Sequence, residues 1–245
     1  MGEAILRLAI VEKFPPDRFE MNGDTGSGAD CYITLSDDKK AAIEVKFWIN
    51  TSDRPIKYSW FKSEILSRFD SVRNQGYRKY LVLFGRKPPN WVKEVSWWCI
   101  RNRIQPFYVY IEDERLDALS ELLGYEGESP IETFADEYYN DLRAVLLLIL
   151  SLVNGEPQDL TDEEWRSVES SLPKMSPRGG SRASTRTALN GVLSVLSEGL
   201  PWSGMPPRYG SFKTAHRYYY RWVSDGHWEM ILGALAKKRY GTKGT

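Results

Sequence analysis

Two carboxylates and one lysine could form a reactive group in the N-terminal part of the chain: Asp30, Glu44 and Lys46. Glu44 and Lys46 are two positions apart in the alternating segment 42–48, so their side chains share one face of a strand. Carboxylate oxygens bind Mg²⁺, and a neighbouring ammonium group stabilises negative charge that develops on a phosphate. These residue types at this spacing predict metal-dependent cleavage of a phosphodiester.

A β-hairpin is expected to bring Asp30 to the other two residues. The alternation in residues 42–48, the second strand of this hairpin, predicts a half-buried strand with Glu44 and Lys46 on its polar face. Residues 31–35 form the predicted partner strand, joined to the second strand by a charged turn. Pairing of Leu35 with Ala41 would place Asp30 across from Lys46 and on the same face as the glutamate.

Further elements surround this hairpin. Helices are predicted at 3–14, 57–74 and 91–102, and buried strands at 79–84 and 106–111. The second helix has an apolar stripe at Phe61, Ile65, Phe69 and Val72. The order helix, hairpin, helix, strand, helix, strand predicts a mixed sheet flanked by helices, which is an α/β fold.

The composition argues against a disordered protein, a zinc-binding protein and a membrane protein. A hydrophobic content of 42% over 245 residues excludes a disordered chain. The two cysteines, Cys31 and Cys99, form no CxxC pair, which favours a reducing compartment and argues against a zinc site. The apolar run 144–150 is shorter than the ~20 residues that a membrane helix requires. Because the N-terminus also lacks a signal peptide, we expect a cytoplasmic protein without a membrane segment.

The net charge of zero conceals three segments of different charge. Residues 1–111 contain 18 basic and 13 acidic residues, residues 112–172 contain 3 and 17, and residues 173–245 contain 12 and 3. A strongly basic C-terminal segment is typical of a module that binds nucleic acid.

The basic segment predicts a small all-α module. Thr161 and Glu164 have the spacing of a capping box at a helix start, and further helices are predicted at 184–198, 212–224 and 227–237. Several short helices with a basic third one are the layout of a helix-turn-helix module. The candidate DNA-binding residues are Arg178, Arg182, Arg186, Arg208, Lys213, His216, Arg217, Tyr220 and Arg221. In the alternative interpretation, the aromatic residues of the third helix belong to the core and the arginines only solubilise the surface.

The N-terminal segment resembles the PD-(D/E)xK nuclease superfamily, which has the restriction-endonuclease-like fold. The matching residues are Asp30, preceded by Ala29 where the family motif has proline, and the triplet Glu44-Val45-Lys46. The resemblance implies a DNA endonuclease that uses Mg²⁺, with Mn²⁺ as a substitute. It also implies that Asp30, Glu44 and the Val45 carbonyl bind the metal and that Lys46 is catalytic.

The start of the chain resembles the first helix of archaeal Holliday-junction resolvases, which share that fold. The matching residues are Gly2-Glu3-Ala4-Ile5-Leu6. This resemblance implies that Glu3 is an additional acid near the metal, and Glu12 competes for the same role.

Residues 160–235 resemble the N-terminal domain of transposases of the insertion-sequence 5 group. The matching segments include Thr161–Trp165, Arg186–Leu193, Glu198–Trp202 and Asp225–Glu229. In that family the domain is a DNA-binding helix-turn-helix that precedes a DDE catalytic domain. We expect no DDE domain after Thr245, so the chain is not expected to be a complete transposase.

Together these features predict three parts: a nuclease-like α/β domain at 1–117, an acidic helical connector at 118–157, and a helix-turn-helix domain at 158–245. The predicted function is a metal-dependent endonuclease targeted to double-stranded DNA, related to mobile-element or restriction biology. The alternatives are a catalytically inactive DNA-binding regulator and a structure-specific nuclease. The apolar segment 134–153 is expected to pack against one of the two domains or against a second subunit. Double-strand cleavage by a single site would require a homodimer, for which this segment is the candidate interface.

Overall fold

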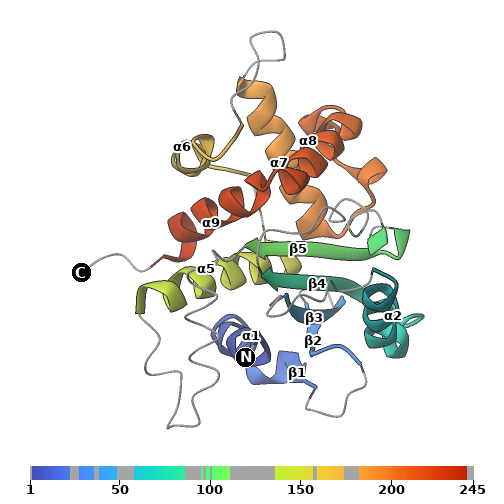
Figure 1. The fold of residues 1–245 in the computed structure, drawn as a ribbon. Helices are drawn as coiled ribbons and strands as arrows, with labels where there is room; N and C mark the ends of the chain where they lie inside the picture. Colours follow the sequence, from blue (N-terminus) through green and yellow to red (C-terminus); the bar gives the residue numbers. More distant parts are fainter. Residues whose placement is uncertain are drawn as a thin grey trace.

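A mixed β-sheet forms the N-terminal half of the protein, and helices gather on its β5 side in the C-terminal half (Figure 1). The computed structural model describes residues 2–22, 28–35, 39–48, 58–85, 95, 98–99, 101–110, 136–156, 159–173 and 182–241. Within these residues the strands are β1 (Phe19–Met21), β2 (Cys31–Thr34), β3 (Lys40–Trp48), β4 (Arg78–Gly85) and β5 (Ile104–Tyr110), in that spatial order.

Strand β2 runs opposite to the other four strands of this sheet. The β1–β2 and β2–β3 pairs are antiparallel, whereas β3–β4 and β4–β5 are parallel. Helix α1 (Gly2–Lys13) precedes the first strand, and α2 (Tyr58–Phe69) connects β3 to β4. The mixed α/β architecture predicted from the sequence is therefore confirmed, with β1 as an unpredicted edge strand. The helix predicted at 91–102 lies mostly outside the described residues.

The pairing of β2 with β3 differs from the predicted register by two residues. Ile33 pairs with Ala41, and the Leu35 amide donates to the Lys39 carbonyl at 2.7 Å. Continued by one step, this register places Asp30 opposite Glu44 instead of opposite Lys46. A slip of two residues preserves the face on which each side chain lies.

The prediction of a half-buried β3 is wrong. Ala42, Ile43 and Glu44 are each 0% exposed, so the strand is covered on both faces. Helix α2 covers the face that includes Glu44, because the buried stripe predicted on this helix (Phe61, Ile65, Phe69 and Val72) packs toward the sheet. Parallel strands in the interior of a sheet are normally covered in this way.

The apolar segment predicted as a dimer interface lies inside the chain. Helix α5 (Asp136–Val153) packs against α1, α7 and α9, and its residues 146–150 are buried. The described apolar residues of α5 thus pack within one molecule, which is one of the two expected arrangements. Within the described residues, no helix is long and apolar enough to cross a membrane.

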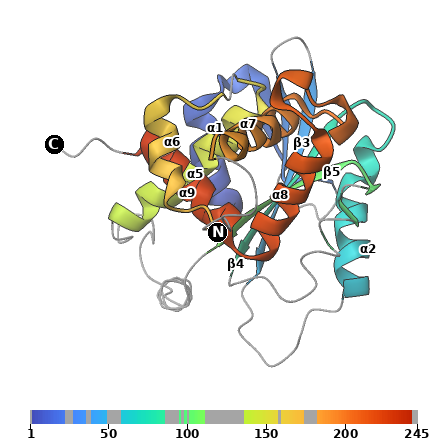
Figure 2. The same cartoon turned by 90° about the horizontal axis from the view of Figure 1, so that it is seen from above.

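The C-terminal helices lie next to one another (Figure 2), and aromatic side chains form part of the core between them. These helices are α6 (Asp162–Glu169), α7 (Arg182–Glu198), α8 (Phe212–Ser224) and α9 (His227–Tyr240), with short 3-10 turns at Trp202–Gly204 and Pro207–Tyr209. Both hydrogen bonds of the capping box predicted at Thr161 and Glu164 are present. Tyr219, Trp222 and Trp228 are fully buried between α8 and α9.

Candidate active site

Asp30 is fixed directly against the middle of β3. The residue is 7% exposed, and its Oδ2 accepts a 2.6 Å hydrogen bond from the Val45 amide. A carboxylate that accepts a backbone amide is held in one orientation. The strand end at Asp30 is thereby joined to the Glu44–Lys46 triplet, as the sequence predicted.

Glu44 is completely buried, and the hydrogen bonding of its carboxylate is incomplete. Its Oε1 lies 2.7 Å from Lys46 Nζ and 3.6 Å from Arg68 Nε, whereas Oε2 has no hydrogen-bond donor among the described residues. Burial, and secondly the charge of Asp30, raise the pKa of Glu44 from 4.5 to about 7, although Lys46 and Arg68 oppose this shift. A buried carboxylate with an unused oxygen beside a second carboxylate favours binding of a cation.

Helix α2 contributes two further charged residues that the sequence analysis did not identify. Glu64 Oε1 lies 3.5 Å from Lys46 Nζ and 2.9 Å from an Arg68 guanidinium nitrogen. The hydrogen bond from Arg68 is the main reason that the pKa of Glu64 is lowered. Lys46 and Arg68 therefore both bridge Glu44 and Glu64, and the site contains two cations as well as three carboxylates when Asp30 is included.

A signal for these residues does exist in the sequence. Glu64 and Arg68 are one helical turn apart, and they border the buried stripe of α2. Their contact with Lys46 depends on the rotation of α2 over the sheet, which periodicity alone does not determine.

The raised pKa of Glu44 predicts an unusual pH dependence of stability in metal-free buffer. Between pH 4.5 and 7 the unfolded carboxyl is ionised while the folded one retains its proton, so the free energy of unfolding falls as pH rises. Glu44→Gln removes this cost, and we expect it to stabilise the protein by up to about 3 kcal/mol above pH 7. Urea unfolding of both proteins at pH 4.5 and pH 8, with EDTA present, measures the effect.

Glu64→Gln is the matched control, because the pKa of Glu64 is lowered and its charged form is the stabilised one. This variant should lose stability above pH 5. Equal pH profiles for wild type and Glu44→Gln would contradict the assigned burial of the carboxylate.

Of the two candidate acids in the first helix, only Glu12 has a side chain within the described residues. Glu3 lies in α1, but its side chain is outside the described residues. Glu12 receives a bidentate hydrogen bond from Arg143 of α5, with one N–O distance of 2.7 Å. Glu12 therefore joins two helices and does not take part in the Glu44 cluster.

The candidate DNA-binding residues fall into three groups. Arg178 and the side chain of Arg182 lie outside the described residues. Lys213, Arg217 and Arg221 are exposed on α8, and Arg221 lies 3.4 Å from Asp225. The other candidates contact residues of the same chain. Arg186 contacts Asp162 and the Leu160 carbonyl, and Arg208 contacts Tyr209. His216 packs against Trp202 and Tyr220.

Comparison with known proteins concerns the C-terminal helices. Residues 160–232 match the family described as "Putative transposase of IS4/5 family". A relative named "Uncharacterized protein y4sN", from Sinorhizobium fredii (strain NBRC 101917 / NGR234), is 29% identical over 80 residues, which cover 32% of this chain and 64% of that protein. The "Insertion element IS402 uncharacterized 16.2 kDa protein" of Burkholderia cepacia is 35% identical over 86 residues, which cover 32% of this chain and 58% of that protein.

These matches identify a transposase-like segment of mobile-element type. The chain spans about three fifths of the length of these two curated relatives. No solved structure matches the chain.

Proposed function

We propose that the protein is a metal-dependent DNA endonuclease that the C-terminal helices direct to duplex DNA. The observation that carries this proposal is the contact of Asp30 with the strand that bears Glu44 and Lys46, together with a fully buried Glu44 whose Oε2 has no donor among the described residues. The order of helices and strands around this strand supports the proposed restriction-endonuclease-like fold.

The residues at β3 suit an ion with oxygen ligands. Asp30 and Glu44 would hold Mg²⁺ together with the Val45 carbonyl, and Mn²⁺ would substitute. The N–H and C=O groups of one strand residue point to the same side, so the Val45 carbonyl lies on the side from which its amide contacts Asp30. When bound, the ion would supply an activated water and neutralise charge on the phosphate.

Lys46 has the position of the catalytic cation. Its side chain is 27% exposed while Glu44 is 0% exposed, so its ammonium group connects the buried carboxylate with the surface. From there it can orient a water for attack or donate to a phosphate oxygen as negative charge increases. Glu64 also contacts this ammonium group, at 3.5 Å, and the hydrogen bond from Arg68 favours the ionised form of Glu64.

The C-terminal helices supply the proposed contact with DNA. Lys213 and Arg217 are one turn apart on the exposed face of α8, whereas Ala215, Tyr219 and Trp222 fill its buried face. A helix with this division can enter a major groove as the second helix of a helix-turn-helix. The match to the IS4/5 transposase family supports this role for α7 and α8.

One observation favours an inactive DNA-binding accessory protein as the second candidate. Lys46 and Arg68 already pair with Glu44, and their charges could take the place of an ion. Among the described residues, no group of three or more His, Cys, Asp or Glu side chains has the arrangement of a metal site.

Cleavage of supercoiled plasmid separates these candidates. The proposed enzyme nicks or linearises plasmid in Mg²⁺, not in EDTA, and Asp30→Asn abolishes the reaction. Faster cutting of junction or flap substrates than of linear duplex would identify a structure-specific nuclease. Plasmid binding without cutting by wild type would reject the nuclease and leave the accessory protein.

A further inference from the structure

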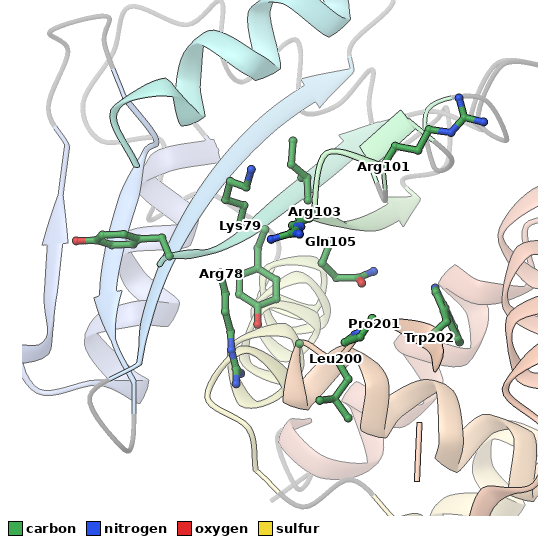
Figure 3. Close-up of a pocket in the computed structure, with 12 residues that line it drawn as sticks. Arg78, Lys79, Arg101, Arg103, Gln105, Leu200, Pro201 and Trp202 are labelled. Atoms are coloured by element: carbon green, nitrogen blue, oxygen red, sulfur yellow. The ribbon is translucent and has the colours of Figure 1, made fainter. Parts of the chain in front are cut away.

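A pocket of about 640 Å³ lies between the sheet and the transposase-like segment (Figure 3). It is lined by residues 77–80, 101, 103–105 and 199–202. The first groups stand at the N-terminal ends of the parallel strands β4 and β5, and the last group follows α7. The pocket therefore adjoins both parts of the protein that the proposed function requires.

The lining of this pocket is strongly positive. It includes Arg78, Lys79, Arg101 and Arg103 and no acidic residue. Arg78 donates to the Ser197 carbonyl at 3.2 Å and Lys79 to the Asn102 carbonyl at 2.8 Å, so backbone oxygens bind these two cations. Arg101 and Arg103 are exposed and have no acidic partner among the described residues.

Several cations elsewhere in the described chain are paired with acids, as in the ion pairs Arg143–Glu12, Arg186–Asp162 and Arg239–Glu164. In the pocket, burial and then the charges of Arg103 and Arg73 lower the pKa of Lys79. Like charges in a confined space repel one another, and an anion between them would remove this cost.

The backbone of Arg103 adds a second indication of a binding site. Its φ of 55° lies in the left-handed region, which a non-glycine residue rarely adopts. Residues held in this way are concentrated at functional sites. Figure 3 shows the Arg103 side chain between Lys79 and Gln105, whereas Arg101 lies apart from them and points outward.

The opposite wall links the pocket to α8. Trp202 contacts His216 and Tyr219 of that helix, with ring centroids 4.9 Å and 5.5 Å apart. On the side of the sheet, Lys79 pairs with Ala42, two residues before Glu44 on the same face of β3. A polyanion that leaves the exposed face of α8 can thus follow positive charge toward the face on which Glu44 lies.

We infer that this pocket binds backbone phosphates of the DNA strand that passes from α8 to the sheet, with Arg103 and Arg101 each contacting one of them. Trp202 provides an aromatic surface beside the strand, on which an unpaired base can stack. This inference rests on the proposed DNA function and extends it to a named contact path between the two parts of the protein.

The test is DNA binding by the variant Arg101→Gln/Arg103→Asn. Asparagine is chosen because it tolerates a positive φ, so the turn is preserved while the charge is removed. The control is Arg166→Gln/Lys237→Gln, which removes two exposed cations from α6 and α9. Fluorescence anisotropy with a labelled short duplex is followed from about 50 mM to about 200 mM salt, in EDTA to prevent cleavage.

The pocket variant should bind about tenfold more weakly and lose about two units from the slope of log K against log salt, and the control should lose neither. If the pocket variant keeps the DNA affinity and the salt slope of the wild type, this inference is wrong, but the proposed function still stands. Absence of DNA binding by wild type would reject the proposed function and this inference together. Inorganic phosphate forms a separate arm: if it raises the Tm of wild type but not of the variant, while DNA affinities are equal, the pocket is a site for free phosphate.

Discussion

Lys46→Ala is expected to lower kcat for DNA cleavage by at least about 10²-fold while the Kd for DNA stays unchanged. The Lys46 ammonium lies 2.7 Å from Glu44 and is partly open to solvent, so it is the cation of the cluster best placed to meet a phosphate. An interaction made only in the transition state affects kcat and leaves ground-state binding unaltered. Single-turnover cleavage of a labelled duplex, with Kd measured separately, separates the two quantities.

Lys40→Ala is the matched control for this prediction. Lys40 begins the same strand and lies an even number of residues from Lys46, so it shares the face but stands at the far end of β3. Its kcat should remain within about twofold of wild type. Equal rates for the wild type and the Lys46 variant, or equal losses for both variants, would contradict the catalytic role.

Lys213→Ala/Arg217→Ala is expected to weaken duplex binding by about 10²-fold and to retain kcat at saturating DNA. Both side chains are exposed on α8, and alanine is a good helix former, so the fold should be preserved. The loss should appear in the association constant and in its salt slope, because two cations no longer contact the DNA.

Anisotropy titrations with this variant and the Arg166→Gln/Lys237→Gln control measure the effect. A common loss in both variants would indicate attraction by total charge, whereas loss only in the α8 variant supports a helix in the groove. Unchanged binding by the α8 variant would remove the proposed recognition helix. Binding by the Arg101→Gln/Arg103→Asn variant would then show whether the pocket is the main contact with DNA.

Much of the candidate site could be predicted because strand side chains repeat every two residues. The alternation predicts that Asp30, Glu44 and Lys46 share one face, and the observed register differs from the predicted one by two residues, a slip that leaves the face unchanged. The capping box at Thr161 and the bounds of α8 could also be predicted from the sequence, because local hydrogen bonds and apolar spacing determine them.

Long-range packing limited the rest of the prediction. Complete burial of Glu44 depends on α2 covering β3, and the same packing brings Glu64 and Arg68 to Lys46. The apolar residues of α5 indicate that the helix is buried, but they do not indicate whether the partner is this chain or another one. The positive pocket combines three segments far apart in the sequence, so no local pattern pointed to it.

Binding of Mn²⁺, followed by electron paramagnetic resonance, tests the central claim most directly. A contaminating nuclease can cut DNA in an assay, but it cannot give this protein a metal site. Asp30→Asn is the informative variant, because asparagine can still accept the Val45 amide while it removes one charge from the site. We predict a saturable Mn²⁺ site in the wild type that Mg²⁺ displaces and that Asp30→Asn and Glu44→Gln each abolish. The same Mn²⁺ binding in all three proteins would contradict the metal-dependent nuclease.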